Sequence, residues 1–155
     1  YRNPNNPKKI IFLYIIIHYH DYMIDFKHLN PPGTPNNFFA APQSLGNKQS
    51  NYDSPVFVTD NHSIIDALYK IATSEPRTKL LKIDRDKGRM EFLQRSLIFR
   101  FPDYIDLEIL EIEDNYCSVN IYSRSKYGSY DFGVNKKRVV RWMENLRNLF
   151  KVKNG

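Results

Sequence analysis

The spacing of apolar residues predicts an amphipathic helix near the middle of the chain. Apolar positions recur every three or four residues over residues 62–75, and a proline follows at position 76. Asp60, Asn61 or Ser63 can cap the N-terminus of this helix, and His62 is interpreted as a capping or surface residue. The face that we expect to be buried consists of Ile64, Ile65, Leu68, Ile71 and Ala72.

A second helical pattern lies near the end of the chain, over residues 135–150. Asn135 is a suitable N-cap residue, so the helix is expected to begin near Lys136 and to pack on a sheet. Its apolar face would hold Val139, Trp142, Met143, Leu146, Leu149 and Phe150.

Between the two helices the sequence has the pattern of strands. Short runs rich in apolar residues are separated by residues typical of turns at 86–88, 102–103 and 114–115. Short turns between successive strands favour an antiparallel meander. The apolar positions over 105–112 change parity, which a bulge near Ile109 would correct. The expected strands cover residues 80–84, 89–96, 97–101, 104–112 and 116–123.

The first third of the chain lacks this periodicity. Residues 1–9 are polar, residues 10–17 are all apolar, and residues 29–54 contain prolines and glycines that disfavour a helix or a central strand. We expect an N-terminal arm, a short apolar segment and a long connector over residues 1–54, followed by a single domain over 55–155. An apolar island at 38–41 is expected to pin the connector onto the domain. The predicted fold class is α+β, with an antiparallel sheet of about five strands packed with two α-helices and an irregular N-terminal arm.

The apolar run over residues 10–17 is shorter than the roughly twenty residues that a membrane-spanning helix needs. It is compatible with a buried or interface helix, a marginal membrane anchor or part of a signal sequence, and we favour a segment packed against a membrane or a partner chain. His18, His20 and Asp21 follow it. Two imidazoles without further ligands at a recognisable spacing are a weak signal, so no metal site is predicted.

Charge is distributed unevenly along the chain, whose formal net charge is +6. Residues 114–155 carry 9 of the 23 Lys and Arg residues and only 3 of the 17 Asp and Glu residues. Such a basic patch attracts phosphate headgroups, nucleic acid or acidic protein surfaces. The tyrosines are scattered through the strands and form no stacking platform, so nucleic-acid binding is not expected. The single cysteine, Cys117, excludes an intrachain disulfide and is interpreted as a small buried hydrophobic residue.

A row of carboxylates lies along the predicted strand over 104–112 and its flanks. At this spacing on an antiparallel sheet, they are typical of a solvated face paired with neighbouring cations, rather than of an acid–base catalytic pair. The expected partners are Lys79, Lys82, Arg89 or Arg95. The row consists of Asp103, Asp106, Glu108, Glu111, Glu113 and Asp114.

Three stretches resemble a known family. Leu-Ile-Phe-Arg-Phe-Pro-Asp at 97–103 and Ser-Lys-Tyr-Gly-Ser-Tyr-Asp-Phe-Gly-Val-Asn-Lys-Lys-Arg at 125–138 resemble the signature of the family called domain of unknown function 1499. Pro-Asn-Asn-Phe-Phe-Ala-Ala-Pro at 35–42 resembles the proline-rich segment of its alphaproteobacterial and organellar members. Lys126 stands where the family pattern has Arg, and Tyr122 where a basic residue is often expected. Lysine lacks the planar fork of arginine, which would weaken an oxyanion site.

The family has no established activity, so the resemblance implies no catalytic residue. It implies a setting in bacterial envelopes, plastids or mitochondria, often with an N-terminal apolar anchor.

The candidate site is the loop and helix start over residues 123–141. Its glycines, cations and free helix N–H groups could cradle a phosphate, a lipid headgroup or an acidic partner loop. Cations at a helix N-terminus oppose the macrodipole, so an anion is expected nearby. Asp131 is the internal candidate, either as a cap or as an ion-pair partner of Lys126, Arg138 or Arg124, and the two interpretations stay open. The candidate residues are Arg124, Lys126, Gly128, Gly133, Asn135, Lys136, Lys137, Arg138 and Arg141.

No nucleophile with an adjacent base, metal set or cofactor loop is visible, so we expect no enzyme and no cofactor. We expect a non-catalytic interaction domain, an accessory subunit of a larger membrane-associated assembly in the mitochondrion, with other subunits as partners. A bacterial envelope or a plastid is the alternative location. The alternative function is a soluble module that binds a small anionic or lipid-headgroup ligand at the basic corner.

Overall fold

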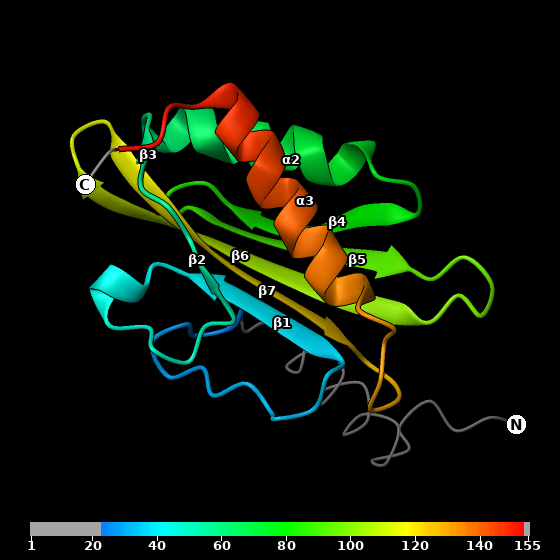
Figure 1. The fold of residues 1–155 in the computed structure, drawn as a ribbon. Helices are drawn as coiled ribbons and strands as arrows, with labels where there is room; N and C mark the ends of the chain where they lie inside the picture. Colours follow the sequence, from blue (N-terminus) through cyan, green and yellow to red (C-terminus); the bar gives the residue numbers. More distant parts are fainter. Residues whose placement is uncertain (1–22, 154–155) are drawn as a thin grey trace, which may run out of the picture.

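A seven-stranded, mostly antiparallel sheet forms the centre of the structure, a computed structural model that describes residues 23–153 (Figure 1). The strands lie in the order β2-β1-β7-β6-β5-β4, and β3 pairs with β7 outside this path. The α+β class and the two helices are confirmed, but the sheet has more strands than the five expected. The strands are β1 (Asn37–Ala41), β2 (Tyr52–Asp53), β3 (Phe57–Val58), β4 (Thr78–Asp84), β5 (Arg89–Arg95), β6 (Pro102–Glu113) and β7 (Tyr116–Ser125).

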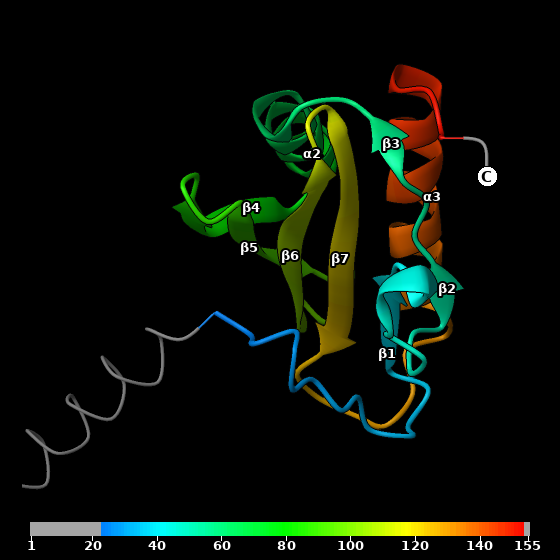
Figure 2. The same ribbon diagram turned by 90° about the vertical axis from the view of Figure 1, so that its left-hand side faces the viewer.

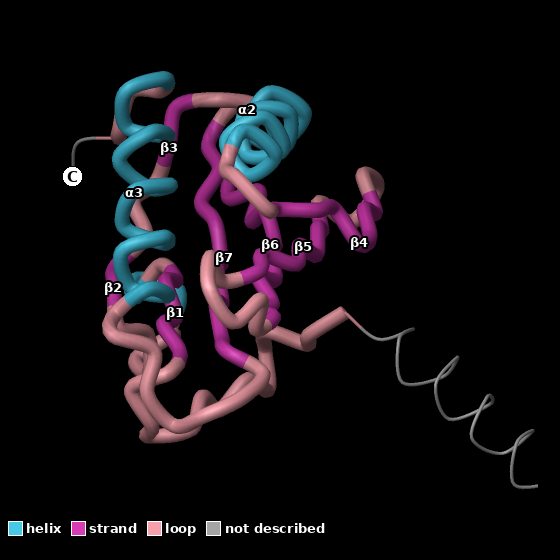
Figure 3. The backbone as a smooth tube through the Cα atoms, turned by 90° about the vertical axis from the view of Figure 1, so that its right-hand side faces the viewer, coloured by secondary structure: helices cyan, strands magenta, loops and turns pink. Residues whose placement is uncertain are grey.

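Both helices pack into one apolar cluster on a single face of the sheet. Helix α2 (Asn61–Ser74) contacts β4 and β6, whereas α3 (Val134–Leu149) runs beside β7 and β1 (Figures 2 and 3). Trp142 of α3 meets Phe92 of β5 edge to face, with ring centroids 6.1 Å apart. The cluster also takes in the inward-facing residues of β6 and β7, so one core holds both layers together.

Helix α2 begins where the sequence predicts. Asp60 is its N-cap: one carboxylate oxygen accepts a hydrogen bond from the Ser63 amide at 2.9 Å and the other from the Ser63 hydroxyl at 2.6 Å. These bonds favour the ionised carboxylate and lower the pKa of Asp60. The proposal of Asp60 as a cap is therefore confirmed.

The segment over residues 29–54, predicted to lack strands, contains β1 and β2. Strand β1 pairs antiparallel with β7, with Phe39 opposite Tyr122, and parallel with β2. Phe39 packs between Phe26 and Tyr122 on the sheet face opposite the helices, with ring centroids 5.9 Å and 6.1 Å away. The predicted pinning of the apolar island is confirmed, and the prediction of a strandless connector is wrong because these aromatic side chains supply a buried face.

The strand predicted over residues 97–101 is a loop. Strands β5 and β6 pair directly up to Arg95 and Pro102, so no sheet position remains for the residues between them. The Ser96 amide donates to the Phe101 carbonyl oxygen at 2.9 Å and closes the loop. Pro102, predicted to lie in a turn, is the first residue of β6, a position that proline tolerates.

The predicted bulge lies at the end of β6 rather than near Ile109. The register between β6 and β7 shifts between Glu111 and Glu113. Leu110, on the face opposite Ile109, and Ile112, within the register shift, are both half-buried.

The predicted solvated row of carboxylates is wrong for Asp103 and Asp106, which are buried. Arg89 does pair with a neighbouring carboxylate as predicted, since it donates to Glu108 at 2.5 Å. The period of the strand placed these carboxylates on alternate faces, but it could not show that both faces near them are covered.

The N-terminal arm over residues 1–9, the apolar run over 10–17, His18 and His20 lie outside the described residues, and the interpretations of them stay predictions. Between residues 23 and 153, none of the helices is long and apolar enough to cross a membrane.

Replacing Phe39 with alanine should lower the free energy of unfolding by about 3–5 kcal/mol, because it empties the centre of the second cluster, which consists of Phe26, Phe39, Ala41 and Tyr122. Urea unfolding of the full chain measures this. The matched control is Leu45→Ala, which removes an exposed side chain of the same segment and should change stability by less than about 0.5 kcal/mol. Equal effects of the two variants would contradict the assignment of β1 to the folded core.

Candidate functional site

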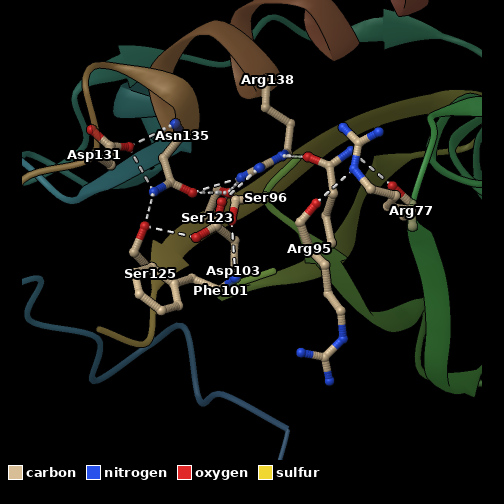
Figure 4. A network of polar contacts seen from close by, with 12 residues as sticks. Arg77, Arg95, Ser96, Phe101, Asp103, Ser123, Ser125, Asp131, Asn135 and Arg138 are labelled. Carbon is tan, nitrogen blue, oxygen red and sulfur yellow. Dashed lines mark hydrogen bonds and ion pairs between the residues drawn. The ribbon is translucent and has the colours of Figure 1, made fainter. Parts of the chain in front are cut away.

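The basic corner between β7 and α3 is built around the buried guanidinium of Arg138, whose exposed fraction is 2% (Figure 4). It donates to Asp103 at 2.8 Å, to Gln94 at 2.7 Å, to the Ser123 hydroxyl at 2.7 Å and to the Asn135 carbonyl oxygen at 2.6 Å. Asp103 also accepts from the Ser125 hydroxyl at 2.7 Å. The charge of Arg138 is therefore neutralised inside the protein, on the ends of β5, β6 and β7.

Asp131 supplies the anion at the start of α3. Its two carboxylate oxygens accept from the Gly133 amide at 2.8 Å and from the Asn135 amide at 2.7 Å. The N-cap position is Gly133, which has a φ of 73° that favours glycine. The prediction of Asn135 as N-cap is wrong because its side chain turns inward, where its amide nitrogen donates to Asp131 at 2.7 Å and to the Asn36 carbonyl at 3.0 Å. Of the two roles proposed for Asp131, the structure has the cap and none of the three ion pairs.

The network continues from Arg138 to the end of α2. Gln94 donates to Glu75 at 2.9 Å, and Glu75 accepts from the Trp142 indole at 2.7 Å and from Arg141 at 2.6 Å. Arg141, a predicted site residue, is therefore also paired with a carboxylate of the chain. Glu75 is the C-cap residue of α2, and these bonds connect it to α3.

The remaining candidate residues do not converge on one cradle. Arg124 lies on the opposite face of the sheet, paired with Asp106 and stacked over the Tyr104 and Tyr122 rings at 5.6 Å and 5.2 Å. Lys126 is exposed, with its ammonium 5.5 Å from the Tyr127 ring centroid. Tyr122, where the family pattern often has a basic residue, is buried in the second cluster.

Gly128, a candidate site residue, shapes the loop between β7 and α3. Gly128 has a φ of 78°, and its carbonyl oxygen accepts from the Asn36 side chain at 2.6 Å, which ties the loop to the segment before β1.

Of the candidate cations in α3, which are Lys136, Lys137, Arg138 and Arg141, only Lys136 and Lys137 are exposed and form no ion pair among residues 23–153. Lys136 lines an open groove of about 550 Å³ together with Gly133, Tyr130 and residues 31–35. The groove contains no buried charged side chain. What remains of the predicted anion cradle is therefore two solvated lysines beside a shallow groove.

The described residues hold no group of three or more His, Cys, Asp and Glu side chains that could bind a metal ion. His28 pairs with Asp25 at 2.7 Å and is exposed, and His62 is exposed at the start of α2, in agreement with its interpretation as a surface residue. Ser123 is buried and donates its hydroxyl proton to Asn135. These side chains do not form a nucleophile–base pair.

The sequence reasoning missed an exposed apolar surface beside the corner, which we call the tip. It combines the loop between β5 and β6 with the loop between β7 and α3. Ring contacts form two groups within it: Phe99 stacks on Phe101 at 5.5 Å and Phe101 meets Tyr127 at 5.9 Å, while Tyr130 meets Phe132 at 5.0 Å between centroids. Its members, between 51% and 80% exposed, are Leu97, Ile98, Phe99, Phe101, Tyr127, Tyr130 and Phe132.

Two signals in the sequence pointed to the tip. The run over residues 97–101 is apolar without a period-2 alternation, and the loop over 125–133 places three aromatic residues among glycines and serines. Apolar residues in a turn cannot all be buried by a sheet.

Arg138→Met should lower the free energy of unfolding by about 3–5 kcal/mol, because it leaves the buried carboxyl group of Asp103 without its partner. Lys137→Met, on the same turn and exposed, is the matched control and should change stability by less than about 0.5 kcal/mol. In a double-mutant cycle with Asp103→Asn, the combined loss should be clearly smaller than the sum. Additive losses would show that the pair is not coupled.

Cys117 should be unreactive in the folded protein, because burial raises the pKa of its thiol to about 11. The folded state holds this proton more tightly than the unfolded state, so the thiol's contribution to stability is present below pH 9.0 and is lost as the pH rises toward 11. Labelling with a thiol reagent at neutral pH should be slow in buffer and fast in denaturant. Unfolding measured against Cys117→Ala should show a wild-type stability that falls relative to the variant over that pH range; fast labelling in buffer would contradict the burial.

Comparisons with known proteins give a family but no activity. A comparison with curated proteins found no match. Among solved structures, the crystal structure of a DUF4468 family protein from Bacteroides ovatus is 15% identical, covers 61% of this chain and 74% of that chain, and has a TM-score of 0.28. A likeness at that score supports no functional argument. The model of a family described as a protein of unknown function, DUF1499, matches residues 29–146, from the segment before β1 to the last turn of α3. The chain therefore belongs to the DUF1499 family.

Proposed function

We propose that this chain is a non-catalytic interaction domain, an accessory subunit of a larger membrane-associated assembly in the mitochondrion, and that the tip is its docking surface. The observation that carries the proposal is the exposure of seven large apolar side chains on two adjoining loops. Single exposed apolar residues are common on protein surfaces, whereas several large ones gathered on two adjoining loops are typical of an interaction site.

The polar side chains of the corner are paired or buried within the chain, which supports a non-catalytic role. Arg138, Arg141 and Asp131 are each occupied by partners within the chain. Ser123 and Cys117 are fully buried, so neither offers an accessible nucleophile. The polar network strengthens the fold at the base of the tip instead of presenting reactive groups to a substrate.

The tip is also preorganised. The Phe101 amide donates to the Ser96 hydroxyl at 2.9 Å, and the Lys126 amide donates to the Pro102 carbonyl at 3.0 Å. These bonds anchor both loops to the same end of β6, so less conformational entropy is lost when the tip is covered.

The alternative module for a small anionic ligand has weaker support. Of its nine candidate residues, Arg124, Arg138 and Arg141 are paired with acids of the chain. The groove beside Lys136 would have to bind an anion without them. We therefore favour the interaction domain over this alternative.

Gentle native purification of the full chain from its own source should recover other subunits, and the double variant Phe99→Ser/Phe132→Ser should lose most of them. The control, Leu45→Ser/Leu149→Ser, removes two exposed apolar side chains outside the tip and should retain them. Circular dichroism and thermal unfolding verify that both variants are folded. Recovery of a lone monomer from the wild type would overturn the proposed function.

A further inference from the structure

We infer that the occupant of the tip is the surface of an anionic lipid bilayer. The inference rests on the proposed function: the tip holds the chain on the membrane beside the other subunits, so that loss of the tip also releases them. It is argued from the position of the apolar residues, the satisfied backbone beneath them and the charge around them.

The apolar residues project from one end of the sheet. Strand β5 ends, β6 begins and β7 ends at this end, which lies to the right in Figure 1, so both loops leave the body side by side. Leu97, Ile98 and Phe99 occupy successive positions in the middle of one loop, and Phe132 is the most exposed of the large apolar residues in the other. The contact between Phe101 and Tyr127 joins the loops into one surface.

The local backbone keeps these side chains exposed. Phe132 has a φ of 56° and Arg100 a φ of 58°, a region that bulky residues rarely adopt. Gly133, next to Phe132, carries the amide that Asp131 binds. The fold thus holds a phenylalanine in an unfavourable backbone conformation while leaving its ring in solvent, an arrangement that contributes nothing to the core.

The polar backbone at the base of the tip is satisfied within the protein. Ser96 and Phe101 exchange hydrogen bonds across the loop, and the Arg100 carbonyl accepts from the Arg95 guanidinium at 3.0 Å. The Arg95 carbonyl accepts from the Arg77 side chain at 3.0 Å. Lipid tails offer no hydrogen bonds, so polar groups near the acyl boundary are best satisfied internally. At the closure of the loop between β5 and β6 they are.

The composition of the tip suits a bilayer interface. Its exposed side chains combine aliphatic residues and phenylalanines with the hydroxyl groups of Tyr127 and Tyr130. Tyrosine favours the boundary between acyl chains and headgroups. Cations surround the apolar surface, and in the two loops the one acid, Asp131, is occupied by the cap. The exposed cations are Arg95, Arg100, Lys126, Lys136 and Lys137.

This charge favours lipid over a protein partner. Lysine is depleted in protein interfaces, whereas each basic side chain near a bilayer is attracted to anionic headgroups, and its long stem lets the charge stay in water.

The test uses the purified full chain and sedimentation with vesicles of phosphatidylcholine, with or without phosphatidylserine. The wild type should bind the vesicles that contain phosphatidylserine and bind pure phosphatidylcholine much more weakly. Phe99→Ser/Phe132→Ser should bind at least about tenfold more weakly, from the loss of two buried rings. Leu45→Ser/Leu149→Ser should bind like the wild type. Arg100→Gln/Lys126→Gln should lose affinity only for the anionic vesicles and show a weaker dependence on salt.

A spectroscopic readout locates the contact. The one native tryptophan, Trp142, is buried and gives a constant background. In Phe99→Trp, lipids brominated in their acyl chains should quench the added fluorescence, whereas in Leu149→Trp they should not. Quenching at both positions or at neither would overturn the inference.

Three further outcomes would also overturn it. The wild type could fail to bind vesicles, the tip variant could bind them as the wild type does, or the wild type could form an oligomer that the tip variant abolishes.

If vesicle binding fails while Phe99→Ser/Phe132→Ser still loses the co-purifying subunits, the tip contacts protein and the proposed function stands. If vesicle binding succeeds and no subunit co-purifies, the proposed function fails and the lipid contact stands.

Discussion

The buried ion pair between Arg138 and Asp103 is the interaction on which the arrangement of this end of the molecule depends. An unpaired guanidinium cannot be buried at acceptable cost, so the helix that carries Arg138 must sit where the sheet offers a carboxylate and neutral acceptors. The ends of β5, β6 and β7 offer Gln94, Asp103 and Ser123 at hydrogen-bond distance. The bonds are directional, which sets the position of α3 more narrowly than apolar packing would.

The ion pair is part of a longer network of polar contacts. Asn135 connects the Arg138 guanidinium to the Asp131 cap, and Gln94 connects it to Glu75 at the end of α2. A chain of polar contacts thus runs from the loop after β7 to the far helix. Because the network is buried and largely satisfied, it strengthens itself in a medium of low dielectric constant. The two tip loops leave the sheet directly beside this network, which explains how large apolar side chains can be held in solvent by a stable base.

The family signature takes on a physical meaning in this arrangement. Four residues of the stretch at 125–138 belong to this network. Asp131 caps the helix and Gly133 forms the left-handed turn. Asn135 is the bridging amide and Arg138 the buried cation. In the same stretch, Tyr127, Tyr130 and Phe132 take no part in that network and face solvent. The stretch therefore combines residues that the fold uses with residues that it leaves for a partner.

The amino-acid sequence by itself determined the two helices, the antiparallel meander from β4 to β7 and the burial of Cys117, and it limited the cap of the first helix to Asp60, Asn61 or Ser63. Each of these follows from neighbours within a few residues: apolar spacing, turn residues and a carboxylate at the start of a helix. Only the tertiary structure decided that Arg138 is a core residue, that β1 joins the sheet through Phe39, and that residues 97–101 form an exposed loop. A charge gives no local sign of its partner when that partner is Asp103, 35 residues away. An apolar run likewise gives no sign of whether a neighbouring strand will cover it, because burial depends on what the rest of the chain brings beside it.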